Sequence, residues 1–233
     1  MTASPGARRA VTGQADSHDQ RFSAAAVRAA YDSAAADYTV AFADDLARLP
    51  IDRAMLDAAV ARLPDNRLAL DLGCGPAPAG AYLGAKGVTA IGADLSAGML
   101  TAARNRNPSV AVVQADMRRL PFRPGAVGAV VAYYSIQHLP RTDLAGALAE
   151  VGRVLASDGV LLVATHLGDG DVFIDEFLGH RIDPVGAALY ERAELVRRLH
   201  AAGFDIDVER QRGPLPHEAD TRRIYLLARR HRR

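Results

Sequence analysis

The chain has 233 residues, of which 49% are apolar and 24% charged, and its formal net charge is +1. The nearly balanced charge gives no global attraction for nucleic acid or for an anionic membrane surface. The single cysteine excludes an internal disulfide framework, and no apolar run is long enough to span a bilayer. We therefore expect a cytoplasmic globular protein, monomeric or homodimeric, that binds neither nucleic acid nor membranes.

The N-terminal region divides into a polar leader and a helical segment. Residues 1–20 are small and polar without a period, which indicates a disordered leader. Alanine-rich helical patterns follow over 23–49, with Ser23 as a good N-cap, and over 51–63. We expect residues 21–64 to form a helical lid of a single domain that spans 21–233.

The middle of the chain, 65–166, alternates between β-branched runs and amphipathic helical patterns. Such alternation predicts a doubly wound α/β fold, with a parallel sheet covered by helices on both faces. A turn is expected at 157–159, before the last of these strands. The predicted strands are 68–72, 88–95, 110–116, 126–135 and 159–166, and the predicted helices between them are 79–87, 96–106 and 141–155.

The remainder, 167–233, is expected to form the acceptor side of a ligand site. Residues 167–186 are long for a connection and mix glycine with aromatic residues, which is typical of a lid or a substrate wall. Two strands, 205–212 and 222–230, follow a further helix. The nine residues between them are too few for a crossover helix, so these strands must form an antiparallel hairpin.

A glycine-containing turn follows the first strand in "LDLGCGPAPAG". A dinucleotide-binding loop has a third glycine where this chain has Pro78. Asp71, two residues before Gly73, would face an anionic pyrophosphate, whereas it suits a ligand that presents a cationic amine. The loop therefore argues against a nicotinamide dinucleotide.

Two further acids end the next two strands. Asp94 is placed to accept both hydroxyls of a ribose. Asp116 is placed to accept from an adenine amino group, with Met117 framing the ring. Each acid alone is an ordinary strand-end residue, but three acids at consecutive strand ends converge on the crevice where such sheets bind ligands.

At these residues the chain resembles the class I S-adenosylmethionine-dependent methyltransferases, particularly the branch that acts on small molecules. The resemblance covers about 27–230 and is carried by "LDLGCGP", "GADLSAGML", "VQADMRRLPF", "VVAYYSIQHLP" and "RVLASDGVLLVATH". It implies a Rossmann-like sheet of seven strands, mostly parallel, which the C-terminal hairpin closes. It also implies S-adenosylmethionine as cofactor and no metal. The cofactor-binding residues that it implies are Tyr38, Asp71, Gly73, Cys74, Gly75, Asp94, Leu95, Met99, Asp116, Met117, Ala132, Tyr133 and His138.

The loop departs from the family pattern at one position. A third glycine is usual where this chain has Ala77, and we expect the extra methyl group to tune cofactor affinity without abolishing binding. Cys74 matches a common family residue that has no covalent role, so it is not expected to be a nucleophile.

The catalytic candidates lie at the carboxyl edge of the sheet. His166 ends the fifth strand, and Tyr134 and His138 follow the fourth. Histidine titrates near neutral pH and can serve as a base toward an acceptor. The plain alternatives are that His138 packs on the cofactor and that Tyr134 is pocket wall.

Four more residues are candidates for binding the acceptor: Tyr31, His180, Glu218 and Arg222. Tyr31 lies seven residues before Tyr38 and hence on the same helix face. Arg222 begins the last strand at the rim of the site, where it can grip a carboxylate or pair with Glu218. Arg222 and Arg223 point to opposite faces of that strand, so at most one of them faces the pocket.

We therefore predict transfer of a methyl group to an oxygen, nitrogen or carbon atom of a small molecule, such as a carboxylate-bearing or specialised metabolite. The product derived from the cofactor would be S-adenosylhomocysteine. One alternative is a protein that binds the same cofactor but catalyses another reaction or none. A nucleic-acid methyltransferase and an NAD-linked oxidoreductase are the other two alternatives.

Overall fold

The N-terminal leader proposed from the sequence lies outside the described residues, except for its last position. The computed structural model describes residues 20–42, 45–64, 68–177, 180–216 and 218–231.

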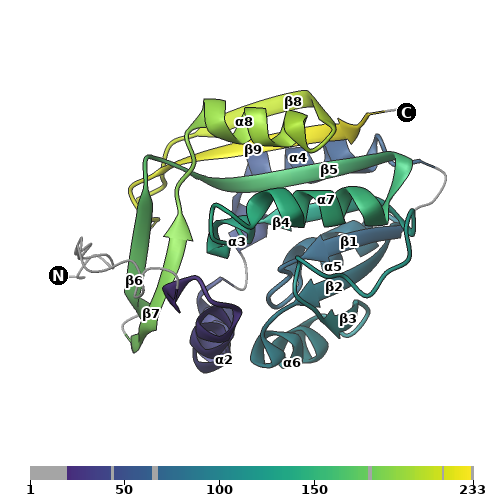
Figure 1. The fold of residues 1–233 in the computed structure, drawn as a ribbon. Helices are drawn as coiled ribbons and strands as arrows, with labels where there is room; N and C mark the ends of the chain where they lie inside the picture. The colour runs from purple at the N-terminus through teal and green to yellow at the C-terminus, as the bar shows by residue number, and fades with distance from the viewer. Residues whose placement is uncertain (1–19, 43–44, 65–67, 178–179, 217, 232–233) are drawn as a thin grey trace.

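A seven-stranded sheet forms the centre of the molecule, with strand order β3-β2-β1-β4-β5-β9-β8 (Figure 1). β1 to β5 are parallel to one another, and β9 runs antiparallel to both β5 and β8. This confirms the predicted doubly wound α/β sheet and its C-terminal hairpin. The strands are β1 Leu68–Leu72, β2 Thr89–Asp94, β3 Ala111–Gln114, β4 Val127–Tyr133, β5 Leu155–Leu167, β8 Phe204–Arg212 and β9 Arg222–Arg230.

Helices cover both faces of this sheet because alternate strand residues point in opposite directions. Leu70 packs in the core below α7 and α8, whereas its neighbour Ala69 packs in the core below α4 and α5. The described part of the chain holds no helix with the length and apolar character needed to cross a bilayer. The helices are α2 Ala24–Ala41, α3 Asp45–Arg48, α4 Pro50–Val60, α5 Pro78–Ala85, α6 Ala97–Arg106, α7 Leu144–Val154 and α8 Arg192–Ala201, with a 3-10 turn η1 at Ile136–His138.

Two predicted elements differ in extent. The helix expected over 23–49 is divided into α2 and α3; its start is as predicted, since the Ser23 hydroxyl accepts a bond from the Ala26 N–H at 3.1 Å. The turn expected at 157–159 lies inside β5, where the pairing with β4 shifts between Val127 and Ala129. A bulge absorbs these polar residues without ending the strand.

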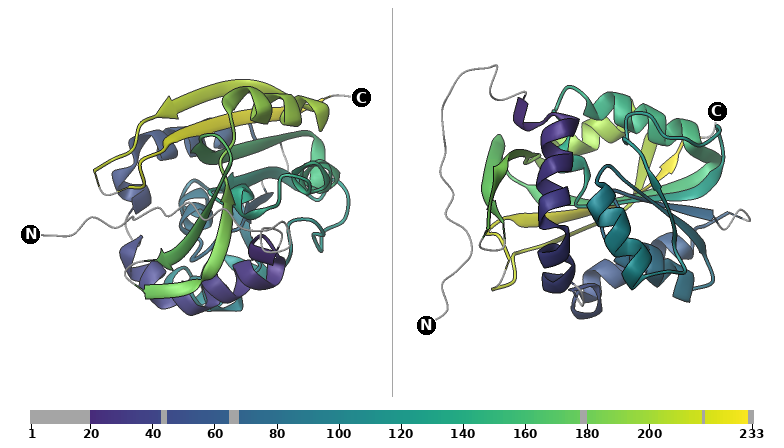
Figure 2. Two further views of the ribbon diagram at one scale, coloured as in Figure 1. Left: turned by 60° about the vertical axis from the view of Figure 1, so that its left-hand side comes forward. Right: turned by 90° about the horizontal axis from the view of Figure 1, so that it is seen from below.

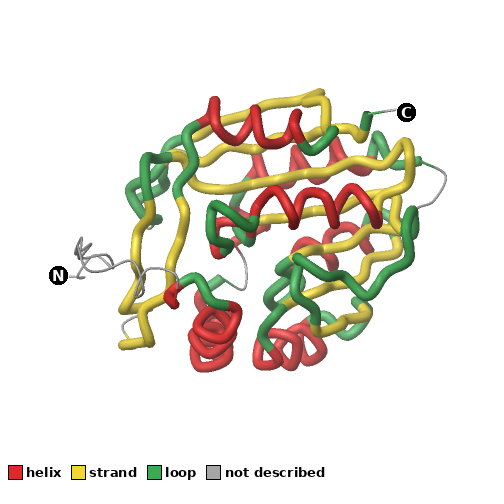
Figure 3. The backbone as a smooth tube through the Cα atoms, in the orientation of Figure 1, coloured by secondary structure: helices red, strands yellow, loops and turns green. Residues whose placement is uncertain are grey.

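The segment 167–186, expected as an irregular loop, is a β-hairpin. β6 Asp171–Phe177 and β7 His180–Ala188 pair antiparallel in a separate two-stranded sheet. The β-branched and aromatic residues of "DVFIDEF" favour a strand, and the surrounding glycines concealed this preference. The hairpin stands beside α2 (Figure 2) and is separate from the main sheet (Figure 3).

Candidate functional site

The carboxyl ends of β1, β2, β4 and β5 bring the predicted residues to one edge of the sheet. Asp71 is the last but one residue of β1, Asp94 is the last residue of β2, and His166 is the last but one residue of β5. α2 and the β6–β7 hairpin lie over the same edge (Figures 1 and 2). A ligand at this edge would therefore contact both the sheet and the N-terminal helix.

The turn after β1 has a backbone that only small residues accommodate well. Gly73, Gly75 and Ala77 all have positive φ values, of 72°, 51° and 61°. A Cβ atom on Gly73 would lie 2.3 Å from the Cβ of Ser135, so glycine is required there for space as well as for conformation. Ala77 is fully buried and adopts the left-handed conformation that glycine adopts without strain.

Asp71 is buried beneath this turn, with 2% of its surface exposed. Its Oδ2 accepts a bond of 2.8 Å from the N–H of Gly80 in the first turn of α5. Burial raises the pKa of Asp71 to about 7, against the lowering effect of that bond. A desolvated carboxylate of this kind is stabilised when a cationic ligand group approaches it.

Asp94 organises the turn from the neighbouring strand. Its Oδ2 accepts from the Gly75 N–H and its Oδ1 from the Ser96 N–H, both at 2.8 Å. Burial raises the pKa of Asp94. In the described part of the chain, neither Asp71 nor Asp94 forms an ion pair with an arginine, lysine or histidine.

α2 is fastened to this edge by Asp32, a residue that sequence reasoning missed. Asp32 Oδ1 accepts from the Ser96 hydroxyl at 2.6 Å and from the Gly98 N–H at 2.8 Å. No local pattern distinguishes Asp32 from the other acid of this helical segment, Asp37. Asp32 therefore joins the lid helix to the N-terminus of α6, two residues beyond Asp94.

The tyrosines of α2 line the same side of the helix. The rings of Tyr31 and Tyr38 are 6.1 Å apart, as their spacing predicted. Tyr38 lies over the turn, where its Cε1 would be 4.0 Å from a Cβ on Gly75. Burial and then neighbouring charges, Asp94 among them, raise the pKa of Tyr38 to about 12, so the phenol is neutral. This places Tyr38 within reach of a ligand bound at the turn.

The remaining cofactor candidates are spread around the edge. Cys74 is buried with its Sγ against Gly92, and burial raises its pKa, so the structure gives it the properties of a packing thiol. Asp116 already accepts a bidentate bond from Arg118, and a contact with adenine stays a prediction. Leu95, Met99, Met117, Ala132 and Tyr133 lie at or just beyond the ends of β2, β3 and β4, or in the first turn of α6.

His138 is fully engaged by hydrogen bonds. Its Nδ1 lies 3.0 Å from the Gly186 carbonyl oxygen and its Nε2 lies 2.7 Å from the Tyr31 hydroxyl. Burial lowers the pKa of His138, so the ring is neutral near pH 7. Because a carbonyl can only accept, Nδ1 carries the proton and Nε2 accepts from Tyr31. His138 thereby links α2 to β7 and has no nitrogen free to act as a base.

His166 and Tyr134 face each other, with ring centroids 5.3 Å apart. His166 Nδ1 lies 2.7 Å from the Thr221 hydroxyl. Burial, and then the charge of Arg223, lower the pKa of His166 to about 4. Tyr134 has a φ of 51°, which is strained for a bulky residue, and its hydroxyl lies 2.8 Å from that of Tyr225.

The placement of Arg222 and Arg223 corrects the sequence prediction. The two residues do point to opposite faces, but Arg223 is the buried one, whereas Arg222 is exposed and donates to Gln211. The register between β9 and β5 determines which arginine is buried. Arg223 lies opposite His166, and Arg222 lies opposite Leu167 at the end of β5. Arg222 is therefore not directed at the site.

Glu218 is paired internally, but with Arg212 and Arg223 and not with Arg222, the partner that the sequence suggested. Both of its carboxylate oxygens accept from Arg212, at 2.7 and 2.5 Å, and Arg223 lies 3.4 Å away. Burial works against ionisation, but the bonds from Arg212 outweigh it and hold the pKa of Glu218 at about 2. His180 begins β7, but its side chain lies outside the described part.

A buried polar network behind Tyr134 was also missed. Asp52 of α4 is 1% exposed, and it accepts from the Tyr225 hydroxyl at 2.9 Å, while Arg212 donates to the same hydroxyl at 2.9 Å. The Asp52 carbonyl accepts from Tyr133. A signal existed, since Asp52 shares a helix face with Met55, Leu56 and Ala59.

Comparisons with known proteins agree with this arrangement. A family model described as a methyltransferase domain matches residues 69–159. A demethylmenaquinone methyltransferase of Beutenbergia cavernae is 37% identical over 112 residues, which are 48% of this chain and 45% of that protein. A trans-aconitate 2-methyltransferase of Azoarcus sp. is 38% identical over 128 residues, which are 54% of this chain and 44% of that protein.

The matched segments thus span less than half of these curated relatives. Among solved structures, a 1,6-didemethyltoxoflavin-N1-methyltransferase of Burkholderia thailandensis superposes with a TM-score of 0.70. That match covers 97% of this chain and 94% of the other at 20% identity, with S-adenosylhomocysteine bound in that structure. The likeness extends through α2 and the C-terminal hairpin and shows a shared fold.

Proposed function

We propose that this chain, a member of the class I S-adenosylmethionine-dependent methyltransferase family, transfers the methyl group of that cofactor to a small-molecule acceptor. The observation that carries the proposal is the pair of acids formed by the buried Asp71 and the half-buried Asp94, which have no cationic partner in the described part of the chain. S-adenosylmethionine carries an ammonium and a sulfonium group, whereas a pyrophosphate would add like charge. The acids therefore favour this cofactor over a nicotinamide dinucleotide.

Each cofactor contact has a residue suited to it. The Asp71 carboxylate would hold the ammonium group, and Asp94 would accept from the ribose hydroxyls with its remaining lone pairs. Tyr38 would lie against the methionine carboxylate, while Asp116 and Met117 would hold the adenine. Ala132 and Tyr133 would border the sulfonium. When bound, the cofactor supplies an electrophilic methyl group, and the protein has to align the acceptor and exclude water.

His138 is best assigned to positioning. Both of its ring nitrogens are taken by Tyr31 and Gly186, which ties the lid helix and the β6–β7 hairpin together over the site. We propose that this connection closes the site against water when a ligand is present. The role expected for His138 as a base is replaced by this structural one.

His166 is our candidate for contact with the acceptor. With Nδ1 directed at Thr221, its Nε2 is left to face a ligand beside Tyr134. A histidine with a pKa of about 4 is neutral near pH 7 but is a weak base. We therefore propose that His166 orients the acceptor by a hydrogen bond, and that it takes a proton only from a group that the methyl transfer has made acidic.

The charges on the hairpin side favour a neutral acceptor over a carboxylate. Arg212 and Arg223 are both close to Glu218, and Arg212 also lies 4.0 Å from Asp52. On this side of the site, the positive charges of Arg212 and Arg223 are thus balanced by the negative charges of Glu218 and Asp52. We propose a polar but uncharged acceptor, with an oxygen, nitrogen or carbon nucleophile.

The test is product analysis with the purified protein, S-adenosylmethionine and a panel of small hydroxyl, amine and carbon acceptors. A methylated product and S-adenosylhomocysteine should appear together in the mass spectrum. Replacement His166→Ala should lower turnover and leave the cofactor dissociation constant unchanged; equal loss of both would make His166 purely structural. Tight cofactor binding with no S-adenosylhomocysteine formed on any acceptor would favour the alternative of a cofactor-binding protein with another activity.

A further inference from the structure

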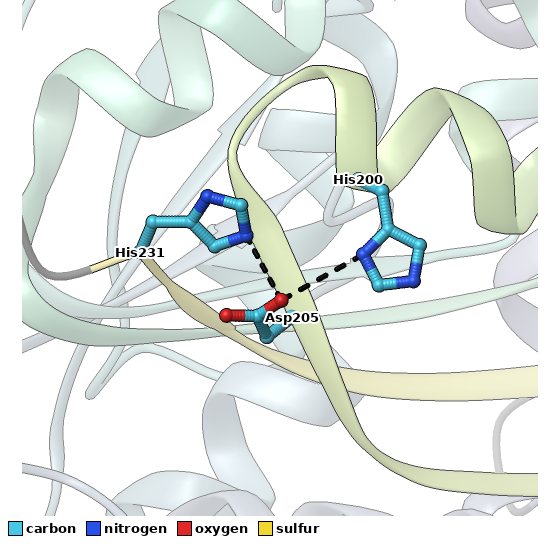
Figure 4. Close-up of side chains that lie close together, drawn as sticks. All are labelled: His200, Asp205 and His231. Atoms are coloured by element: carbon cyan, nitrogen blue, oxygen red, sulfur yellow. Dashed lines mark ion pairs between the residues drawn. The ribbon is translucent and has the colours of Figure 1, made fainter.

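Three potential metal ligands meet at the surface next to the end of β9 (Figure 4). They are His200 in the last turn of α8, Asp205 in β8 and His231 just after β9. Asp205 Oδ1 lies 2.9 Å from His231 Nε2 and 3.8 Å from His200 Nδ1. All three ligand atoms lie within 4.8 Å of one another. Both imidazoles thus direct a nitrogen at the same carboxylate oxygen.

The backbone holds these residues in place through one glycine. The Gly203 N–H donates to the His200 carbonyl at 3.0 Å, and the Gly203 carbonyl accepts from the His231 N–H at 2.8 Å. Gly203 has a φ of 86°, which lets the chain leave α8 and enter β8 directly. Asp205 is held by its pairing with Arg229 in the β8–β9 ladder. The cluster is therefore set by helix and strand ends.

The cluster is remote from the cofactor edge. Arg229, two residues before His231, pairs with Val160 near the start of β5, whereas His166 at the other end of β5 pairs with Arg223. His231 thus lies at the edge where the parallel strands begin. Asp71 and Asp94 lie at the edge where those strands end.

The ligand atoms of the cluster determine which metal ions it would bind. Two imidazoles and one carboxylate suit Zn²⁺ and its neighbours in the first transition series, whereas Ca²⁺ and Mg²⁺ prefer oxygen ligands. Bonds of about 2.0–2.2 Å in a tetrahedral arrangement place ligand atoms roughly 3.4 Å apart. The separations of 2.9 and 3.8 Å lie on either side of that value, and the two imidazole nitrogens lie within 4.8 Å of each other, so side-chain rotation at the exposed histidines would bring the three atoms into place.

We propose that His200, Asp205 and His231 form a three-ligand site for a divalent transition-metal ion, with Zn²⁺ as the physiological class, that fastens the end of the chain to α8. Water would complete the coordination, because the described part of the chain supplies three protein ligands. Its position at the opposite edge of the sheet separates this site from methyl transfer. Without a metal, the same contacts are surface ion pairs of small energetic value, and the two interpretations predict different responses to zinc.

Zinc titration of the full chain distinguishes the two interpretations. Zn²⁺ added as the chloride to chelator-treated protein should bind with one-to-one stoichiometry in calorimetry. The melting temperature should rise with zinc concentration, by about 5 °C at a hundredfold excess over the dissociation constant. Co²⁺ used as a probe should give the visible absorption bands of a tetrahedral site with nitrogen ligands.

Replacements of the ligands supply the decisive comparison. His200→Gln, Asp205→Asn and His231→Gln should each weaken Zn²⁺ binding at least tenfold, and circular dichroism should show that the exposed changes leave the fold intact. The matched control is Asp207→Asn, which removes a carboxylate from the same strand but outside the cluster. Asp207 pairs with Arg229. The zinc affinity of this variant should equal that of the wild type. Equal affinities in all variants, or no binding at millimolar Zn²⁺, would overturn the proposal.

Discussion

The Tyr31 hydroxyl donates a 2.7 Å hydrogen bond to Nε2 of His138, 107 residues away in the chain. The other nitrogen of that ring donates to the Gly186 carbonyl in β7. One neutral imidazole therefore joins three elements, α2, η1 and β7, that cover the edge of the sheet. The lid is held in place by specific polar contacts as well as by apolar packing.

Removing the Tyr31 hydroxyl should loosen this connection. Tyr31→Phe leaves the Nε2 lone pair of a buried histidine without a partner, so the free energy of unfolding should fall by about 1–3 kcal/mol. Urea denaturation measures the change. Tyr82→Phe is the matched control, since the Tyr82 hydroxyl donates to Asp57 at an exposed position, and it should change stability by less than about 0.5 kcal/mol. Equal effects of the two replacements would show that the hydrogen bond of Tyr31 contributes no more to stability than the exposed bond of Tyr82.

The ionised side chain of Asp71 should lower the stability of the fold, although it supports cofactor binding. Its pKa is raised to about 7, from 3.8, so its contribution to stability is present below pH 4 and is lost as the pH rises through 7. Asp71→Asn does not titrate and keeps an acceptor for Gly80. The unfolding free energy of this variant relative to the wild type should therefore increase by about 2 kcal/mol between pH 5 and pH 8.

The same variant should bind S-adenosylhomocysteine at least tenfold more weakly at pH 7 than the wild type does, because the ammonium group loses its counter-ion. Denaturation at several pH values and calorimetry together provide the measurement. A pH-independent stability difference would contradict the burial of an isolated carboxylate, and unchanged affinity would remove Asp71 from the cofactor site.

His166 should show the opposite pH dependence. Its pKa is lowered to about 4, so its contribution to stability is present above pH 6.5 and is lost as the pH falls from 6.5 toward 4. The stability advantage of the wild type over His166→Gln should shrink by about 1–2 kcal/mol between pH 6.5 and pH 4.5. An advantage that stays constant over this range would mean that His166 titrates as it does in an unfolded chain.

The turn after β1 should depend on close packing against Ser135. Gly73→Ala places a methyl group 2.3 Å from the Ser135 Cβ and should destabilise by about 3 kcal/mol or more. Gly87→Ala is the control, since Gly87 has a similar φ of 75° but open space around it, and should show the conformational strain alone, about 1 kcal/mol. Adding Ser135→Gly should recover part of the loss caused by Gly73→Ala, and independent, additive effects would refute the packing argument.

The sheet and the cofactor edge could be predicted because they follow from local patterns. β-branched runs between amphipathic helices predict a parallel sheet, and acids at successive strand ends must then converge, as Asp71 and Asp94 do. The capping role of Ser23 is equally local. These features depend on residue type and spacing within about ten positions.

The acceptor side could not be predicted as well because it depends on register and on distant partners. Which of Arg222 and Arg223 is buried is set by the pairing of β9 with β5, and a shift of one residue would exchange them. The bond of Tyr225 to Asp52 joins residues 173 positions apart, and no local pattern encodes it. The β6–β7 hairpin was obscured because it forms a sheet of its own, in which β7 packs on α2 and neither strand joins the main sheet.

The most direct test of the cofactor assignment is calorimetric titration of the purified chain with S-adenosylhomocysteine, with NAD as the comparison ligand. We predict one-to-one binding of S-adenosylhomocysteine, no binding of NAD, and at least a tenfold loss of affinity in Asp94→Asn, which replaces the charged acceptor of the ribose hydroxyls. Binding of NAD without binding of S-adenosylhomocysteine, or an unchanged dissociation constant in Asp94→Asn, would contradict the assignment of this edge.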